Sequence, residues 1–309
     1  MRTPLLLAAL LLAGCPSADP VTDDDDAVAN DDDSTEAPVE ELFKMVIIAD
    51  PHVAGPVEHE ERTQAAVDWV NANATTLGIE LVVVLGDISW GSRLQAGFDL
   101  LDQLEPTWVP IIGDNVLHTS GDAAYAATYG PQLDEAATVL DDWEQAPWPV
   151  PDERLGDDAW FQNIRFSHKG VLFVGVDWNI RHLSGNLAEF GDFNDVPGGT
   201  HDWLLDSLDG ETERADESIV LLSHVPMVLG TFSVAEKAAF AELLEPVRPK
   251  VFANFAGHLH IDAFDEDFEA GYETWVTDAI WDDVNMIRLV TISGNGARME
   301  WAQEAIELE

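Results

Sequence analysis

The chain has 309 residues, enough for one large α/β domain or two small ones. Its 59 Asp and Glu against 14 Lys and Arg give a formal net charge of −45. This balance argues against nucleic acid or an anionic membrane surface as a partner, because clustered Lys and Arg bind both. Cys15 is the single cysteine, so no internal disulfide can support the fold and the core must do so.

The N-terminal residues have the pattern of an export signal. A weakly basic start, 1–4, precedes an apolar stretch, 5–12, that is too short to span a bilayer. Small residues then lead to Cys15, an ending that resembles the bacterial lipoprotein box, in which the cysteine becomes the lipid-bearing first residue of the mature chain. This predicts a signal peptide over 1–14 and an exported, membrane-anchored lipoprotein facing the periplasm or the cell surface of a bacterium. The alternative is an ordinary signal cleaved a few residues away.

The segment after Cys15 has a different composition. Residues 15–42 contain the Asp runs 23–26 and 31–33 and no basic residue. Like charges repel and almost nothing here can be buried, so we predict an acidic, disordered tether. Weak calcium binding by the Asp runs is the less favoured reading. The folded domain is then expected over 43–309, with the membrane as a partner through the lipid anchor only.

Strands and helices alternate in the first part of this domain. Apolar runs predict strands at 43–50, 79–85 and 108–112, with helices between them at 57–74 and 94–104. A strand-helix-strand-helix-strand order implies a parallel sheet with right-handed crossovers.

The second part begins with a less periodic region, 117–156, which we predict to form a cap-like insertion of short helices and loops. Two strands are expected to pair across a turn at Lys169 and Gly170, and Thr200 is expected to be an N-cap. The strands predicted in this part are 160–166, 171–176, 218–222, 250–255, 272–277, 286–292 and 297–301, and the helices are 200–208 and 234–244. The last strand is expected to complete a second sheet.

Side chains that can bind a metal follow the strands at their carboxyl ends, where α/β sheets place their ligands. In chain order they are Asp50, His52, Asp87, Asp114 or Asn115, His224, His258 and His260. A spacing of two puts both members of a pair on one side of an extended segment. Oxygen and imidazole donors together fit Mn, Fe or Zn better than Ca or Mg, and one shared carboxylate can hold two such ions. Bound cations would also reverse the acidic field locally for an anionic substrate.

These motifs resemble the calcineurin-like metallophosphoesterase superfamily, whose blocks are DxH, GD, GN(H), a strand-end His and GHxH. The resemblance extends from Asp50 to His260. It implies an α/β fold, a four-layer α-β-β-α sandwich of two mixed sheets flanked by helices. It also implies hydrolysis of a small phosphomonoester or phosphodiester by a hydroxide that bridges two divalent metal ions, Mn, Zn or Fe.

The resemblance also assigns the ligands. One metal ion would be held by Asp50, His52, Asp87 and His260. The second would be held by Asp87, Asn115, His224 and His258. In the alternative register of the third block, Asp114 is the ligand in place of Asn115.

The chain departs from the family in the third block, because no His follows Asn115 directly. His118, three residues on, is a candidate for the catalytic role near the leaving group; the alternative is a loop histidine without a role. Trp90 stands where purple acid phosphatases have an iron-bound tyrosine, so no such site is expected. Arg181 and His182 are candidates for substrate binding, since a guanidinium matches phosphate oxygens, but a structural or exposed position is the favoured reading.

Two classes of function follow from these residues. The first is a dinuclear metallophosphoesterase. The alternative is a catalytically weak or inactive surface module of the same fold that binds metal, which the altered third block favours. The otherwise complete ligand set favours the enzyme, because a decayed site should lose its costly buried polar groups early.

Overall fold

The computed structural model describes residues 38–146, 149–153, 156–181, 190–211, 218–228, 230–265, 272–282, 284–295 and 299–308. The predicted signal peptide, Cys15, most of the predicted tether and His182 lie outside the described residues. Within the described ranges, no helix is both long and apolar enough to cross a membrane.

The first sheet has five strands in the order β14-β13-β1-β2-β3. Their bounds are β1 (Glu40–Ile48), β2 (Ile79–Leu85), β3 (Thr107–Ile111), β13 (Met286–Gly294) and β14 (Met299–Glu307). Strands β1, β2 and β3 are parallel, as predicted, and their crossovers contain α1 (Val57–Leu77), the 3-10 turn η1 (Gly91–Arg93) and α2 (Leu94–Leu101). The strand predicted at 297–301 was expected to complete the second sheet, and this prediction was wrong, because the corresponding strand β14 forms a hairpin with β13 in the first sheet. This hairpin pairs antiparallel with β1 and so covers an edge whose polar groups would otherwise lack partners.

The second sheet has seven strands in the order β11-β12-β10-β9-β8-β7-β4. Their bounds are β4 (Asp141–Gln145), β7 (Ile164–His168), β8 (Val171–Val176), β9 (Ser218–Ser223), β10 (Val251–Ala256), β11 (Ala263–Asp265) and β12 (Glu273–Val276). The four strands β8, β9, β10 and β12 are parallel, and the outer three are antiparallel. The predicted turn between β7 and β8 is confirmed, with φ of 48° at Lys169 and 84° at Gly170.

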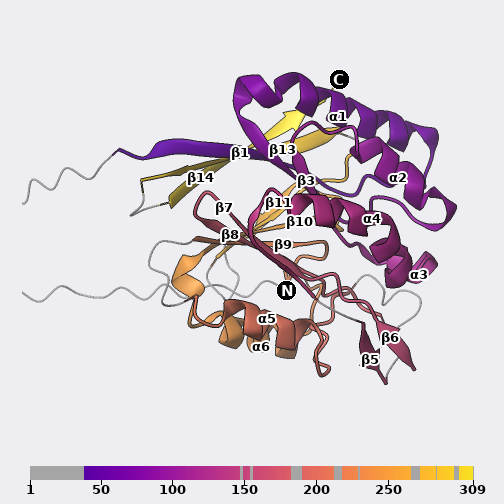
Figure 1. Ribbon diagram of the computed structural model, residues 1–309, viewed down its shortest axis with the longest axis vertical. Coiled ribbons are helices and arrows are strands. Elements are labelled where there is room, and N and C mark those ends of the chain that lie inside the picture. Colours follow the sequence, from indigo (N-terminus) through magenta and orange to yellow (C-terminus); the bar gives the residue numbers. More distant parts are fainter. Residues whose placement is uncertain are drawn as a thin grey trace, which may run out of the picture. The chain divides into compact units, whose positions relative to one another are not determined.

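The two sheets pack face to face and helices cover their outer faces (Figure 1). Apolar side chains of both sheets, such as Ile47, Val83, Phe173 and Phe255, form the core between them. Helices α1, α2 and α4 (Asp122–Ala136) pack on the outer face of the first sheet. Helices α5 (Thr200–Leu208) and α6 (Val234–Leu244) pack on the outer face of the second, where the 3-10 turn η2 (Arg248–Lys250) follows α6. The predicted four-layer sandwich of two mixed sheets is confirmed.

The region predicted as a cap-like insertion, 117–156, is mostly part of these layers. Helix α4 packs on β3, where Gln132 Nε2 donates to the carbonyl of Trp108 at 2.9 Å, and β4 pairs with β7. Among the described residues of this region, β5 (Val150–Asp152) alone stands apart, in a small sheet with the later β6 (Asp157–Ala159). The helix is hard to recognise from sequence because Gly130 and Pro131 interrupt its pattern.

Two predicted boundaries also differ. Strand β1 begins at Glu40, within the predicted tether, because Glu40 and Glu41 already pair with β13. The N-cap of α5 is Gly199, whereas Thr200 is the first helical residue. The Thr200 hydroxyl donates instead to the carbonyl oxygen of Asp177 at 2.5 Å, so it anchors the helix to the end of β8.

Candidate metal centre

Three carboxylates and four histidines meet at the carboxyl ends of β1, β2, β3, β9 and β10. They are Asp50, His52, Asp87, Asp114, His224, His258 and His260. All except Asp114 were the main predictions from sequence, and Asp114 was the alternative. The loops that follow these strands bring residues together that are up to 210 positions apart in the chain, since parallel strands end at the same edge of a sheet.

The first group consists of Asp50, His52 and His260. Asp50 Oδ1 lies 3.3 Å from His260 Nε2 and 3.7 Å from His52 Nε2. Asp50 is fully buried, and its Oδ2 accepts the backbone N–H of His258 at 2.8 Å. One oxygen of this carboxylate thus anchors the loop after β10, while the other faces two imidazoles.

The second group consists of Asp114, His224 and His258. Asp114 Oδ1 lies 3.0 Å from His224 Nε2 and 3.4 Å from His258 Nδ1. His224 Nδ1 donates to the carbonyl of Leu85 at 2.8 Å, which sets the ring orientation and directs Nε2 toward the carboxylates.

Asp87 lies between the two groups. Its Oδ2 is 3.4 Å from His52 Nε2 and 3.6 Å from His224 Nε2. Asn115 holds this carboxylate by two donors: its backbone N–H reaches Asp87 Oδ1 at 3.0 Å, and its side-chain Nδ2 reaches Oδ2. The position of Asp87 suits a ligand shared by two ions.

The backbone at this centre is left-handed at five of the seven residues. The φ angles are 49° at Asp50, His52 and His260, 45° at Asp87 and 69° at His258. Such conformations cost about 1–3 kcal/mol each in non-glycine residues and persist where the surroundings enforce them. The extended geometry expected for the two DxH-like pairs was therefore wrong, although the side chains do converge. Tight turns, rather than extended segments, point them into one space.

Glycines next to these residues make room for the side chains. A Cβ at Gly86 would overlap the His224 ring, one at Gly113 would overlap Asp87, and one at Gly257 would overlap Asp50. Gly86 also has φ of 82°, a conformation that other residues rarely adopt.

Burial and charge shift the pKa values of these groups in opposite directions. Burial alone would lower the pKa of His52, but the carboxylates of Asp50 and Asp87 beside the ring raise it to about 9. Burial opposes the charge on Asp50, but the neighbouring imidazoles outweigh it and hold the pKa of that carboxyl well below its usual range. The same competition lowers the pKa of Asp87 and raises that of His224. The carboxylates therefore stay ionised, and their negative charge is balanced by protonated imidazoles or by bound cations.

The donor set fits divalent cations. Asp50 Oδ1 and His52 Nε2 are buried and lack a hydrogen-bond partner among the described residues. Buried polar atoms without partners are rare, and here two of them face each other across 3.7 Å in a group rich in carboxylate and imidazole. Mixed oxygen and imidazole donors suit Mn, Zn or Fe.

The other predicted site residues lie elsewhere. His118 is exposed on α3 (Asp114–Thr119), one turn after Asp114. The side chain of Arg181 is buried, and its guanidinium pairs with Asp177 at 2.5 Å and with Asp122 at 3.2 Å. Both carboxylates pair with this cation, which agrees with the structural position considered for Arg181 alongside substrate binding.

Sequence reasoning missed two tryptophans, Trp90 and Trp281, that contact the histidines of the first group. The Trp281 ring lies 5.1 Å from that of His52 and 4.9 Å from that of His260, and it stacks on His59 at 4.7 Å. Trp90 contacts His52 from another direction, with ring centroids 5.0 Å apart. The position of Trp281 in the sequence could have indicated this contact, because Trp281 follows the carboxyl end of β12, the next parallel strand after β10.

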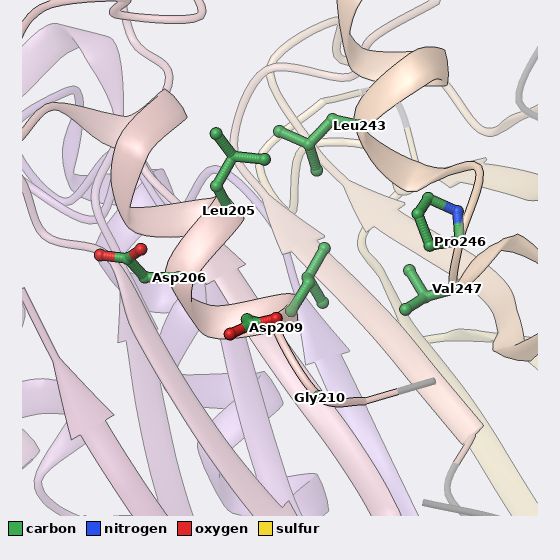
Figure 2. A pocket seen from close by; sticks show the side chains of 8 residues that line it. Leu205, Asp206, Asp209, Gly210, Leu243, Pro246 and Val247 are labelled. Carbon is green, nitrogen blue, oxygen red and sulfur yellow. The ribbon is translucent and has the colours of Figure 1, made fainter. Parts of the chain in front are cut away.

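A separate hollow lies between α5 and α6, away from these residues. Leu205 and Leu243 line it from the two helices, together with Pro246 and Val247 (Figure 2). No member of the metal centre borders it.

The four-layer α/β sandwich, with carboxylates and histidines gathered at the strand ends, places this chain among the α/β proteins that can bind metal ions. The chain belongs to the calcineurin-like phosphoesterase family, whose sequence model matches residues 43–262. Members of this family bind divalent metals, in agreement with the carboxylate and histidine groups found here. None of the curated proteins compared with the chain matches it.

The solved structures that the chain resembles have low sequence identity to it. The sulfate thiohydrolase SoxB of Thermus thermophilus is 12% identical with a TM-score of 0.45, over 88% of this chain and 57% of SoxB. The chain thus spans just over half the length of that protein. The phosphopantetheinyl hydrolase PptH of Mycobacterium tuberculosis is 14% identical with a TM-score of 0.42, over 78% of this chain and 91% of PptH. Vps29 of Entamoeba histolytica, in complex with Zn²⁺, is 11% identical with a TM-score of 0.36, over 86% of this chain and 99% of Vps29.

Proposed function

We propose that the protein is a metal-dependent phosphoesterase that hydrolyses a small phosphomonoester or phosphodiester. One observation carries the proposal: three buried carboxylates and four histidines converge at one place, and Asp50 Oδ1 and His52 Nε2 have no hydrogen-bond partner in the part of the chain that the structure describes. Membership of the phosphoesterase family supports this class of reaction.

The ligand sets follow from the two groups. The first ion would be held by Asp50, His52, Asp87 and His260. The second would be held by Asp87, Asp114, His224 and His258. The proximity of Asp114 to both histidines favours the alternative register, with Asp114 as the ligand. Asn115 then orients Asp87 through its two hydrogen bonds.

A pair of divalent cations would supply an activated water as nucleophile and stabilise the charge on the phosphoryl oxygens. The chain's own residues prepare for this. The carbonyl of Leu85 keeps a proton on His224 Nδ1, so that Nε2 is free to ligate. His118, one helical turn from Asp114 on the exposed side of α3, is our candidate proton donor to the leaving oxygen.

The test is metal-dependent turnover. Purified protein, stripped with chelator, is reloaded with Mn²⁺ or Zn²⁺ and assayed on p-nitrophenyl phosphate and bis(p-nitrophenyl) phosphate. We expect two ions per chain and hydrolysis of at least one ester. Two bound ions without turnover on a broad phosphate panel would favour the inactive metal-binding module instead.

We further propose that the protein is exported and anchored through a lipid on Cys15. The lipoprotein-like sequence before Cys15 motivates this, together with the acidic segment after it, which would hold the catalytic domain away from the bilayer. Labelling of cells with a fatty-acid analogue should mark the wild type and not Cys15→Ser. Equal labelling of both would refute the anchor.

A further inference from the structure

We infer that Asn179 is a positioning residue that holds the turn carrying Asp114 and Asn115. Asn179 follows β8 and is 1% exposed. Its side-chain Nδ2 donates to the carbonyl oxygen of Ile112 at 3.1 Å. Because Ile112 directly precedes Gly113 and Asp114, this hydrogen bond joins the end of β8 in the second sheet to the end of β3 in the first.

Ile112 depends on this bond because β3 is an edge strand. Strand β3 is the last in its sheet, pairs with β2 alone and ends at Ile111. Ile112 is fully buried, and a buried carbonyl without a partner is costly. The Asn179 amide therefore supplies to the Ile112 carbonyl the hydrogen-bond donor that a neighbouring strand would supply in the middle of a sheet.

The orientation of this amide is fixed. Nδ2 of Asn179 also donates to Asp177 Oδ1 at 3.1 Å, so a flipped amide would set its oxygen against two acceptors. Asp177 is itself held at Oδ2 by Arg181 Nη2 at 2.5 Å and by the backbone N–H of Gln162 at 2.8 Å. Arg181 is further tied to Asp122 at the start of α4. The buried cation predicted to bind substrate thus acts on the site through Asp177 and Asn179.

Holding Ile112 preserves two contacts of the metal centre together. Asp114 Oδ1 lies 3.0 Å from His224 Nε2, and the backbone N–H of Asn115 reaches Asp87 Oδ1 at 3.0 Å. Any tilt of the turn after β3 changes both distances. The inference rests on the proposed function only where it concerns metal binding.

The test compares Asn179→Ala with Asn163→Ala. Asn179 Oδ1 has no hydrogen-bond partner among the described residues, so the alanine variant removes the contacts of Nδ2 alone. Asn163 is a matched control: it is fully buried and bonds Asp177 N at 2.7 Å and Thr200 Oγ1 at 3.1 Å. Its hydrogen bonds hold the same strand end without involving Ile112.

The first readout is backbone hydrogen exchange of Asn115 in the metal-free protein. We expect Asn179→Ala to speed exchange at Asn115 by about ten- to a hundredfold, because the turn loses its anchor, and Asn163→Ala to leave it unchanged. Equal rates in both variants would overturn the inference. If Asn179→Ala does not fold, the smaller polar replacement Asn179→Ser tests the same contact.

The second readout is Mn²⁺ affinity by calorimetry. Asn179→Ala should weaken the ion held by Asp114 about 10–100-fold and the ion held by Asp50 much less, because only the shared Asp87 connects that ion to the turn; Asn163→Ala should change neither. Equal weakening of both ions would also count against the positioning role. A wild-type chain that binds no Mn²⁺ would refute the proposed function, whereas the exchange rates would still decide the role of Asn179.

Discussion

At the scale of single residues, Asp87 connects the two halves of the metal centre. Its Oδ2 lies 3.4 Å from His52 Nε2 and 3.6 Å from His224 Nε2, and Asn115 holds it by two hydrogen bonds. We expect Asp87→Ala to reduce bound metal from two ions to fewer than one and to lower kcat about a thousandfold or more, since metal-activated water is lost. Metal analysis and a phosphate-ester assay measure both. The exposed Asp102→Ala serves as control, and retained activity in Asp87→Ala would show that the ligand assignment is wrong.

His118 gives a second prediction at this scale. If it donates a proton to the leaving oxygen, its removal matters only for leaving groups that need protonation. His118→Ala should lower kcat about a hundredfold for an alkyl phosphate and leave p-nitrophenyl phosphate nearly unaffected. The same loss on both esters, or no loss on either, would remove His118 from the mechanism.

At the scale of elements, the turns after the strands determine the site. Gly86 has φ of 82° and a Cβ there would overlap His224, whereas Gly210 has φ of 81° and nothing within 4 Å of the position of a Cβ. Both alanine variants should lose about 1–2 kcal/mol of unfolding free energy from left-handed strain. Only Gly86→Ala should also displace His224 and weaken metal binding.

Urea unfolding and a metal titration separate these two effects. A Gly86→Ala protein that binds both ions as tightly as Gly210→Ala would show that the close approach of Gly86 to His224 is unimportant.

At the scale of the whole molecule, metal should stabilise the fold. Ions that bind the native state alone contribute about 2.7 kcal/mol per site at a hundredfold excess over Kd. For a domain of this size that corresponds to a rise in Tm of roughly 5 °C per site. Calorimetry of stripped protein with and without Mn²⁺ measures the shift, and Asp87→Ala should show almost none.

The net charge of −45 predicts a dependence on salt. Carboxylates repel one another across the folded surface, and salt shortens the Debye length from about 10 Å at 0.1 M to about 3 Å at 1 M. We expect Tm to rise by several degrees between 0.1 and 1 M NaCl. A neutral osmolyte at equal osmolality controls for solvent exclusion, and a Tm that is flat or falls in NaCl would contradict the charge argument.

Local patterns predicted most of the elements, because strand and helix periods depend on neighbouring residues. The bounds of β2, α5 and α6 agree with the sequence analysis to the residue. Patterns failed where the partner is distant or the pattern is interrupted. The β13–β14 hairpin joined the first sheet because β1 had an open edge, and α4 was obscured by Pro131.

By itself the sequence determined the family, the sandwich and six of the seven side chains of the metal centre, because each follows a recognisable apolar strand. The tertiary structure showed Asp114 beside His224 and His258, Asn115 against Asp87, Arg181 paired with two carboxylates, and left-handed turns at the strand ends. These contacts depend on how the two sheets pack together. Which of two neighbouring residues in a turn faces the site depends on the side chains of the other sheet, and His224 and His258 lie more than a hundred positions away from Asp114 in the chain.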